Sequence, residues 1–192
     1  IYMREFAGVD PETGRALYYL DPDEGDFETT TDYTAAQRAR QGTGLPWVYG
    51  GFGTSVTAYG FDFSVQCAYQ LGGKVYDGSY EALMHNGDNI GHNWHMDIQD
   101  AWTPDNTNTD VPVINAAYDS YQKTSTRFLV SSDYLSLNSV VLGYTLPERL
   151  LKNTGVASLR VYFAGDNLAL LSVRKGFDPR QYIAGGGSTT TG

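Results

Sequence analysis

The chain has 192 residues, of which 41% are hydrophobic, and a formal net charge of −9. This length suits one ordinary domain, and no segment approaches the roughly 18 uninterrupted apolar residues of a membrane helix. Because the sequence carries no basic stripe, it does not favour nucleic-acid binding, and the single Cys67 cannot form an internal disulfide.

The first predicted strand covers residues 1–7 and is already under way where the sequence begins, so we expect this chain to be a piece of a longer polypeptide. A minor hairpin is expected next, with its turn at residues 10–14 and a short return strand at 16–20. Two long strands follow at 47–59 and 61–71, joined by a tight turn at Gly60, where a positive φ costs little. In the second strand, six apolar residues alternate with polar or small ones from Phe61 to Leu71, which strongly favours a β-strand over a helix.

Another pair of long strands is predicted at 134–146 and from 159 to about 171. The apolar positions in the first of these change parity partway, and a β-bulge near Asn138 and Ser139 would reconcile the two phases. The turn between the strands is predicted to hold a short helix, with Pro147 at its first position and Gly155 after its end.

These strands are about twice the usual length of 5–6 residues, and alternation over such lengths is typical of a transmembrane β-barrel. Two long connections, 8–46 and 77–133, alternate with short turns near 60 and at 147–156. Barrels have this arrangement, with extracellular excursions and short periplasmic turns. The long segments also hold most of the acidity, with net charges of −5 and −7. Short helical turns are expected within the second, around 79–85 and 95–102. The predicted fold class is therefore all-β, with antiparallel strands forming part of a large transmembrane barrel.

Several motifs, taken in order, resemble one family. They are Tyr49-Gly50-Gly51-Phe52-Gly53, Leu71-Gly72-Gly73-Lys74-Val75-Tyr76-Asp77, Trp102-Thr103-Pro104-Asp105-Asn106, Ser125-Thr126-Arg127-Phe128-Leu129, Leu142-Gly143-Tyr144-Thr145-Leu146-Pro147 and Gly176-Phe177-Asp178-Pro179. Together they are similar to the C-terminal barrel portion of SusC/RagA-type TonB-linked outer-membrane transporters.

The resemblance implies a large barrel with an N-terminal plug in the outer membrane of a Gram-negative cell. It implies nutrient uptake, of glycans or peptides, beneath a SusD-like surface lipoprotein, with energy supplied by the TonB complex through parts that this chain does not contain. No cofactor is implied, and the expected role is non-enzymatic.

Three side chains in the second long connection are candidates for substrate binding. Trp94, His95 and Trp102 could offer flat surfaces to a sugar or a peptide, although aromatic residues more often supply buried contact area. His92, His95 and Asp97 also raise the possibility of a metal site, but no further His or Cys lies nearby.

The acidic stretch 21–28 is a second candidate site, because its spaced carboxylates resemble a shortened calcium loop. An acidic turn in water is the alternative. The sequence contains no Gly-x-Ser-x-Gly, His-Glu-x-x-His or Gly-x-Gly-x-x-Gly motif, so no catalytic residue is predicted.

Two other functions are open at this point. The alternating strands could form the core of a soluble carbohydrate-binding β-sandwich, or the loop carboxylates could serve a surface hydrolase. The hypothesis of a transmembrane barrel requires the apolar side of strand 61–71 to face hydrocarbon. It also predicts unpaired strand edges at 1–7 and 157–171.

Overall fold

The structure, a computed structural model, describes residues 1–87, 90–118, 123–152 and 155–184. The chain divides into two compact units. Unit 1 combines residues 1–44 with 74–130, and unit 2 combines residues 45–73 with 131–192.

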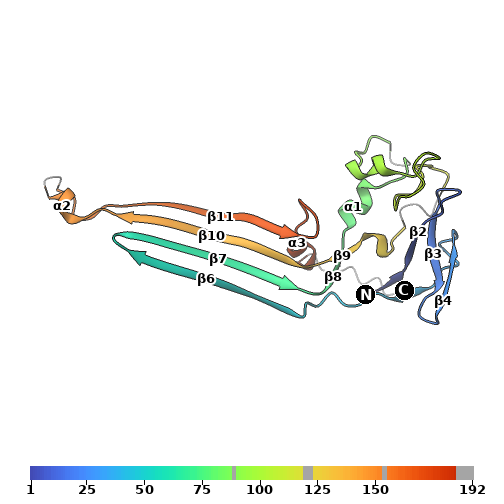
Figure 1. Cartoon of the computed structure of the whole chain (residues 1–192), viewed down its shortest axis with the longest axis horizontal. Helices are drawn as coiled ribbons and strands as arrows, with labels where there is room; N and C mark the ends of the chain where they lie inside the picture. Colours follow the sequence, from blue (N-terminus) through green and yellow to red (C-terminus); the bar gives the residue numbers. More distant parts are fainter. Residues whose placement is uncertain (88–89, 119–122, 153–154, 185–192) are drawn as a thin grey trace. The chain divides into compact units, whose positions relative to one another are not determined.

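Unit 2 is built on one four-stranded antiparallel sheet (Figure 1). Its strands are β6 (Val48–Ala58), β7 (Phe61–Leu71), β10 (Tyr134–Thr145) and β11 (Arg160–Ser172), in the order β11-β10-β7-β6. These are the four long strands that the alternation predicts, with bounds within about one residue. Within the described residues, β6 and β11 form the two edges of the sheet.

The predicted bulge in β10 is confirmed. Leu137 pairs with Cys67 on one side of β10, whereas Ser139 pairs with Gln66, so Asn138 is an extra residue between them. The same shift interrupts the pairing of β10 with β11. Because one extra residue moves the following side chains to the other face, Leu135 and Leu137 share a face with Val140 and Leu142.

Both short connections of unit 2 follow local sequence. Tyr59 and Gly60 adopt positive φ angles of 52° and 84° between β6 and β7, as a tight hairpin turn requires. Helix α2 (Glu148–Leu151) lies between β10 and β11, and Pro147 immediately precedes it instead of occupying its first position. A further helix, α3 (Pro179–Ala184), follows β11. No helix in the described segments has the length and apolar character needed to cross a membrane.

Unit 1 shows that the two long connections are folded. It contains a three-stranded sheet of β2 (Phe6–Val9), β3 (Ala16–Asp21) and β4 (Asp26–Thr30), which includes the predicted minor hairpin. Two-stranded ribbons join β1 (Tyr2–Arg4) to β5 (Arg38–Arg40) and β8 (Lys74–Tyr76) to β9 (Leu129–Ser131). Its helical elements are α1 (Gly78–Leu83) and the 3₁₀ helices η1 (Met96–Asp100) and η2 (Thr126–Phe128), and the first two lie where helical turns are predicted.

The prediction of one strand over residues 1–7, with an open edge, is wrong. This segment divides at Glu5 into β1 and β2, which pair with β5 and β3 respectively. The physical reason is that the backbone changes partner here: the Glu5 carbonyl accepts a hydrogen bond from the Tyr19 amide, and the pairing of β2 shifts register before Gly8. The segment therefore belongs to unit 1 and not to the long sheet.

Two small hydrophobic clusters hold unit 1 together. One contains Met84, Ile98, Ala101, Val111 and Phe128, all drawn from the second long connection. The other surrounds Tyr18 and packs Phe6 and Tyr33 against it. The two connections also meet directly, since the Tyr33 hydroxyl donates to the Thr124 carbonyl at 2.8 Å. Strand β2 contacts the second connection as well, because the Phe6 amide donates to Thr126 Oγ1 at 2.9 Å.

Candidate functional site

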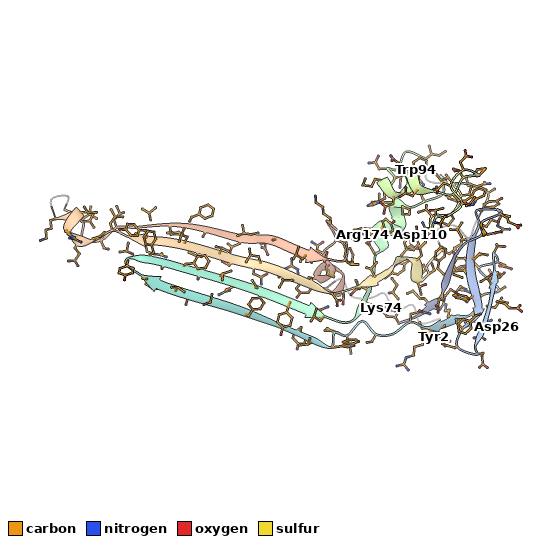
Figure 2. The ribbon with its side chains drawn as sticks, in the orientation of Figure 1. Tyr2, Asp26, Lys74, Trp94, Asp110 and Arg174 are labelled. Carbon is orange, nitrogen blue, oxygen red and sulfur yellow. The ribbon has the colours of Figure 1, made fainter. Side chains whose placement is uncertain are left out.

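The long sheet of unit 2 has one nonpolar face, and this face is uncovered within the described residues. Strand pairing aligns Phe52 on β6, Cys67 on β7 and Leu137 on β10, and likewise Val56, Phe63, Leu142 and Phe163 across all four strands. The four strands that carry these side chains form a single layer (Figure 2). Phe52, Val56, Phe63, Leu142 and Phe163 are exposed, from 40% for Phe63 to 70% for Phe163, whereas Cys67 and Leu137 are half-buried. The soluble-sandwich alternative requires such residues to be buried against a second layer, and unit 2 does not bury them.

The opposite face, which we call the polar face, is formed mainly by hydroxyl, amide and small side chains. Its members include Tyr49, Gly51, Gly53, Ser55 and Thr57 on β6; Asp62, Ser64, Gln66, Ala68 and Gln70 on β7; Tyr134, Ser136, Ser139, Val141, Gly143 and Thr145 on β10; and Arg160, Tyr162, Ala164, Asp166, Leu170 and Ser172 on β11. Because the two faces differ so sharply, the sheet suits a boundary between hydrocarbon and water.

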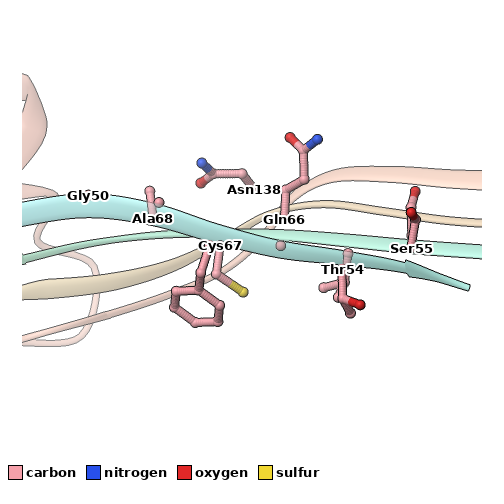
Figure 3. Close-up of a pocket in the computed structure, with 12 residues that line it drawn as sticks. Gly50, Thr54, Ser55, Gln66, Cys67, Ala68 and Asn138 are labelled. Carbon is pink, nitrogen blue, oxygen red and sulfur yellow. The ribbon is translucent and has the colours of Figure 1, made fainter.

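A hollow lies along β6 and β7 (Figure 3), where glycines replace three side chains of β6. On the polar face its lining includes Gly51, Gly53, Gln66, Ala68 and Asn138. The Gln66, Ala68 and Asn138 side chains project to the same side of the sheet, opposite to that of Cys67. This hollow is not among the predicted sites, although the Gly-rich run of β6 and the bulge of β10 both contribute to it.

Trp102 has a structural position in unit 1. Its indole nitrogen donates to the Pro11 carbonyl at 3.2 Å, and its ring lies so close to Gly14 that a Cβ there would be 2.5 Å from Trp102 Cδ2. Trp102 therefore pins the second long connection to the hairpin of the first. Much of its ring is occupied by these contacts.

Trp94 and His95 immediately precede η1 and make separate contacts. Trp94 stacks on His85 with ring centroids 5.2 Å apart and donates to the His85 carbonyl at 2.9 Å, yet it is 47% exposed (Figure 2). His95 caps η1 by accepting from the Asp97 amide, and its ring packs edge-on against Tyr80. Of the three predicted substrate contacts, Trp94 offers the most open ring, and each of the three packs against different neighbours.

The cation-binding ideas gain no support from the described residues. In them, no cluster of three or more His, Cys, Asp or Glu side chains could hold a metal ion. The acidic stretch 21–28 forms the tip between β3 and β4. The Asp23 carboxylate accepts a hydrogen bond from the Arg40 amide, and the Asp26 carboxylate accepts one from the Glu28 amide. These carboxylates satisfy nearby backbone donors.

One carboxyl group in unit 1 has a raised pKa. Glu81 on α1 is partly buried, and burial raises its pKa, even though hydrogen bonds from Tyr76 and Thr124 oppose this change. Asp10 and Asp32 have the opposite behaviour, because hydrogen bonds from Thr13 and Thr34 respectively lower their pKa values.

The charge is divided between the units. Unit 1 contains 17 acidic and seven basic residues, whereas unit 2 contains five acidic and six basic residues. The acidity predicted for the long connections therefore belongs to one folded unit, while the long sheet is close to neutral.

Comparison with known proteins points to one class. No family model matches the chain. It is 30% identical over 183 residues to TonB-dependent receptor P3 of Formosa agariphila, a match that covers 93% of this chain and 18% of that receptor. Among solved structures, the RagAB peptide transporter matches with a TM-score of 0.77 at 30% identity, covering 93% of this chain and 20% of that one. The RagAB importer in its open-open state matches with a TM-score of 0.74 at 32% identity.

The chain thus spans about a fifth of the length of each relative. These matches confirm the resemblance to TonB-linked transporters that the motifs indicate, and the relatives are named as a receptor and as transporters, not as enzymes.

Proposed function

We propose that this chain, as part of a TonB-dependent transporter of the SusC/RagA type, supplies a section of barrel wall and a folded extracellular unit. The uncovered nonpolar face of the long sheet is the observation that carries the proposal. Apolar side chains exposed over four strands are costly in water, at about 25 cal/mol per Å², but are favourable against lipid. In a barrel, the edges β6 and β11 would pair with neighbouring strands, which removes their open hydrogen-bonding groups.

The proposed orientation places the turn at residues 59–60 and helix α2 on the periplasmic side. The long segments 8–46 and 77–133 would then be extracellular, as barrel architecture favours. Unit 1 would form part of the surface at which a SusD-like lipoprotein docks and substrate first arrives. The TonB complex would act through parts of the transporter outside this chain.

The proposed substrate is a nutrient peptide, with a glycan as the alternative. Peptide transport is what the RagAB relatives are named for. The excess of ten acidic residues in unit 1 opposes the approach of strongly anionic solutes, which favours neutral or cationic peptides. We propose no enzymatic step and no cofactor.

Spin labels on the complete transporter in lipid vesicles test the placement of the sheet. In a Cys67→Ser background, Phe63→Cys and Ser64→Cys place labels on opposite faces of β7. We expect the label at 63 to be accessible to dissolved oxygen, which concentrates in hydrocarbon, and the label at 64 to a water-soluble nickel chelate. Equal access of the chelate to both positions would contradict the barrel-wall assignment.

Orientation is tested separately in intact cells. Glu24→Cys lies at the tip between β3 and β4, and Lys152→Cys follows α2. A membrane-impermeant maleimide is expected to label position 24 in intact cells and position 152 only after permeabilisation. The reverse pattern would invert the proposed topology.

A further inference from the structure

The hollow on the polar face exists because small residues meet at one point of the sheet. A Cβ at Gly51 would lie 3.2 Å from the Cys67 carbonyl oxygen, and one at Gly53 would lie 2.7 Å from that of Val65. Ala68, which pairs with Gly51, adds only a methyl group. The close approach of β7 therefore disfavours larger residues at 51 and 53, so no side chain of β6 fills the hollow at these two positions.

Two side-chain amides stand beside this floor. Gln66 pairs with Gly53 and lies beside it, since a Cβ at 53 would be 3.4 Å from Gln66 Cγ. Asn138 reaches the same side because the bulge in β10 adds it to the polar face (Figure 3). Asn138 Oδ1 accepts from Ser136 Oγ at 2.7 Å, which fixes its orientation. Within the described residues, the Gln66 side chain and the Asn138 amino group make no hydrogen bond, so both are available to a ligand.

The chemistry of the lining selects the kind of group that fits. None of the twelve residues that line the hollow carries an ionisable acid or base other than the Cys67 thiol, which lies on the nonpolar face. A side-chain amide both donates and accepts hydrogen bonds, so two of them match a neutral group that also does both. A peptide main chain presents such a group at every residue.

We propose that the polar-face part of this hollow, with Gln66 and Asn138, is a contact site for the main-chain amides of a peptide that crosses the barrel. The inference rests on the proposed function and adds a location and a mode of recognition to it. Contacts to the main chain are independent of peptide sequence, and neutral amides hold a substrate weakly enough to release it.

The experiment uses the complete transporter in detergent micelles, incubated with a tryptic digest of casein, and quantifies the retained peptides by mass spectrometry. Ala68→Met fills the floor of the hollow. The double variant Gln66→Leu with Asn138→Leu removes both amide groups while keeping side chains of similar volume. We expect each variant to lower peptide retention about tenfold, the effect of losing one or two hydrogen bonds. Ala164→Met is the matched control, because Ala164 lies on the polar face of β11 outside the hollow, and it should retain peptides like the parent.

Thermal unfolding of each variant establishes that the barrel is intact, and only variants that unfold like the parent are scored. Parental retention by both Ala68→Met and the double Leu variant would overturn the inference. Retention of neutral oligosaccharides instead of peptides, lost in Ala68→Met, would also overturn it, because the ligand would then be a glycan. Neither outcome affects the spin-label test of the barrel wall, so the two proposals fail independently.

Discussion

Asp62 on β7 and Arg160 on β11 form a bidentate ion pair that reaches across the intervening strand β10. Arg160 Nε donates to Asp62 Oδ1 at 3.1 Å and Nη2 donates to Oδ2 at 2.5 Å, although β10 lies between β7 and β11. Gly143 is the residue on β10 between them, and a Cβ there would be 2.5 Å from both carboxylate oxygens. The pair therefore depends on the absence of a side chain at position 143.

Gly143→Ala should displace the Asp62 carboxylate, separate it from Arg160 and lower the unfolding temperature of the barrel, because a methyl group at 143 would occupy the space that the carboxylate oxygens fill. Calorimetric unfolding of the complete transporter in micelles measures this. Adding Asp62→Ala removes the obstructing carboxylate, so the double variant should be more stable than Gly143→Ala alone. If the two substitutions are simply additive, the described geometry is wrong.

The sequence predicts the long sheet well because each strand is decided locally. From Phe61 to Leu71 the period of two is uninterrupted, and the change of parity within 134–146 requires a bulge at one place. Unit 1 was not predictable in this way. Its key contacts, such as Trp102 with Gly14, join residues 88 positions apart, and no periodicity marks which partner a loop residue will find. The hollow was missed for a similar reason, because it arises from glycines and amides on different strands.

Trp102→Ala should loosen unit 1 because it removes both the ring that covers Gly14 and the hydrogen bond to Pro11. We expect a loss of roughly 2 kcal/mol, the value of burying one large side chain, and faster proteolysis within 8–46 and 77–133. Limited proteolysis of the complete transporter measures the rate. Trp94→Ala is the matched control, since Trp94 is more exposed. Equal sensitivity of the two variants would show that Trp102 does not join the two connections.

Glu81 should make the local stability of unit 1 depend on pH. Because burial raises its pKa in the folded state, folding favours the protonated carboxyl. Its contribution is complete below its ordinary pKa of 4.5 and is lost as the pH rises through the raised value. Hydrogen exchange of the α1 amides, corrected for intrinsic rates, should therefore show weaker protection at pH 7 than at pH 4.5. Glu81→Gln should remove this difference in protection. If the Gln variant shows the full difference, a group other than Glu81 causes the pH dependence.

Neighbouring residues in the middle of β7 should differ sharply in their tolerance of a charge. Val65 pairs with Thr54 and Val140 and lies on the nonpolar face, whereas Ser64 pairs with Ser55 and Val141 and lies on the polar face. Val65→Arg should cost about 2–4 kcal/mol, as a cation does when placed against lipid near the bilayer midplane, and should reduce the amount of assembled barrel in the outer membrane. Ser64→Arg adds the same charge to a face in contact with water and should assemble nearly normally. The contrast depends on which side of one strand meets hydrocarbon, so equal assembly of the two variants would argue that neither face does.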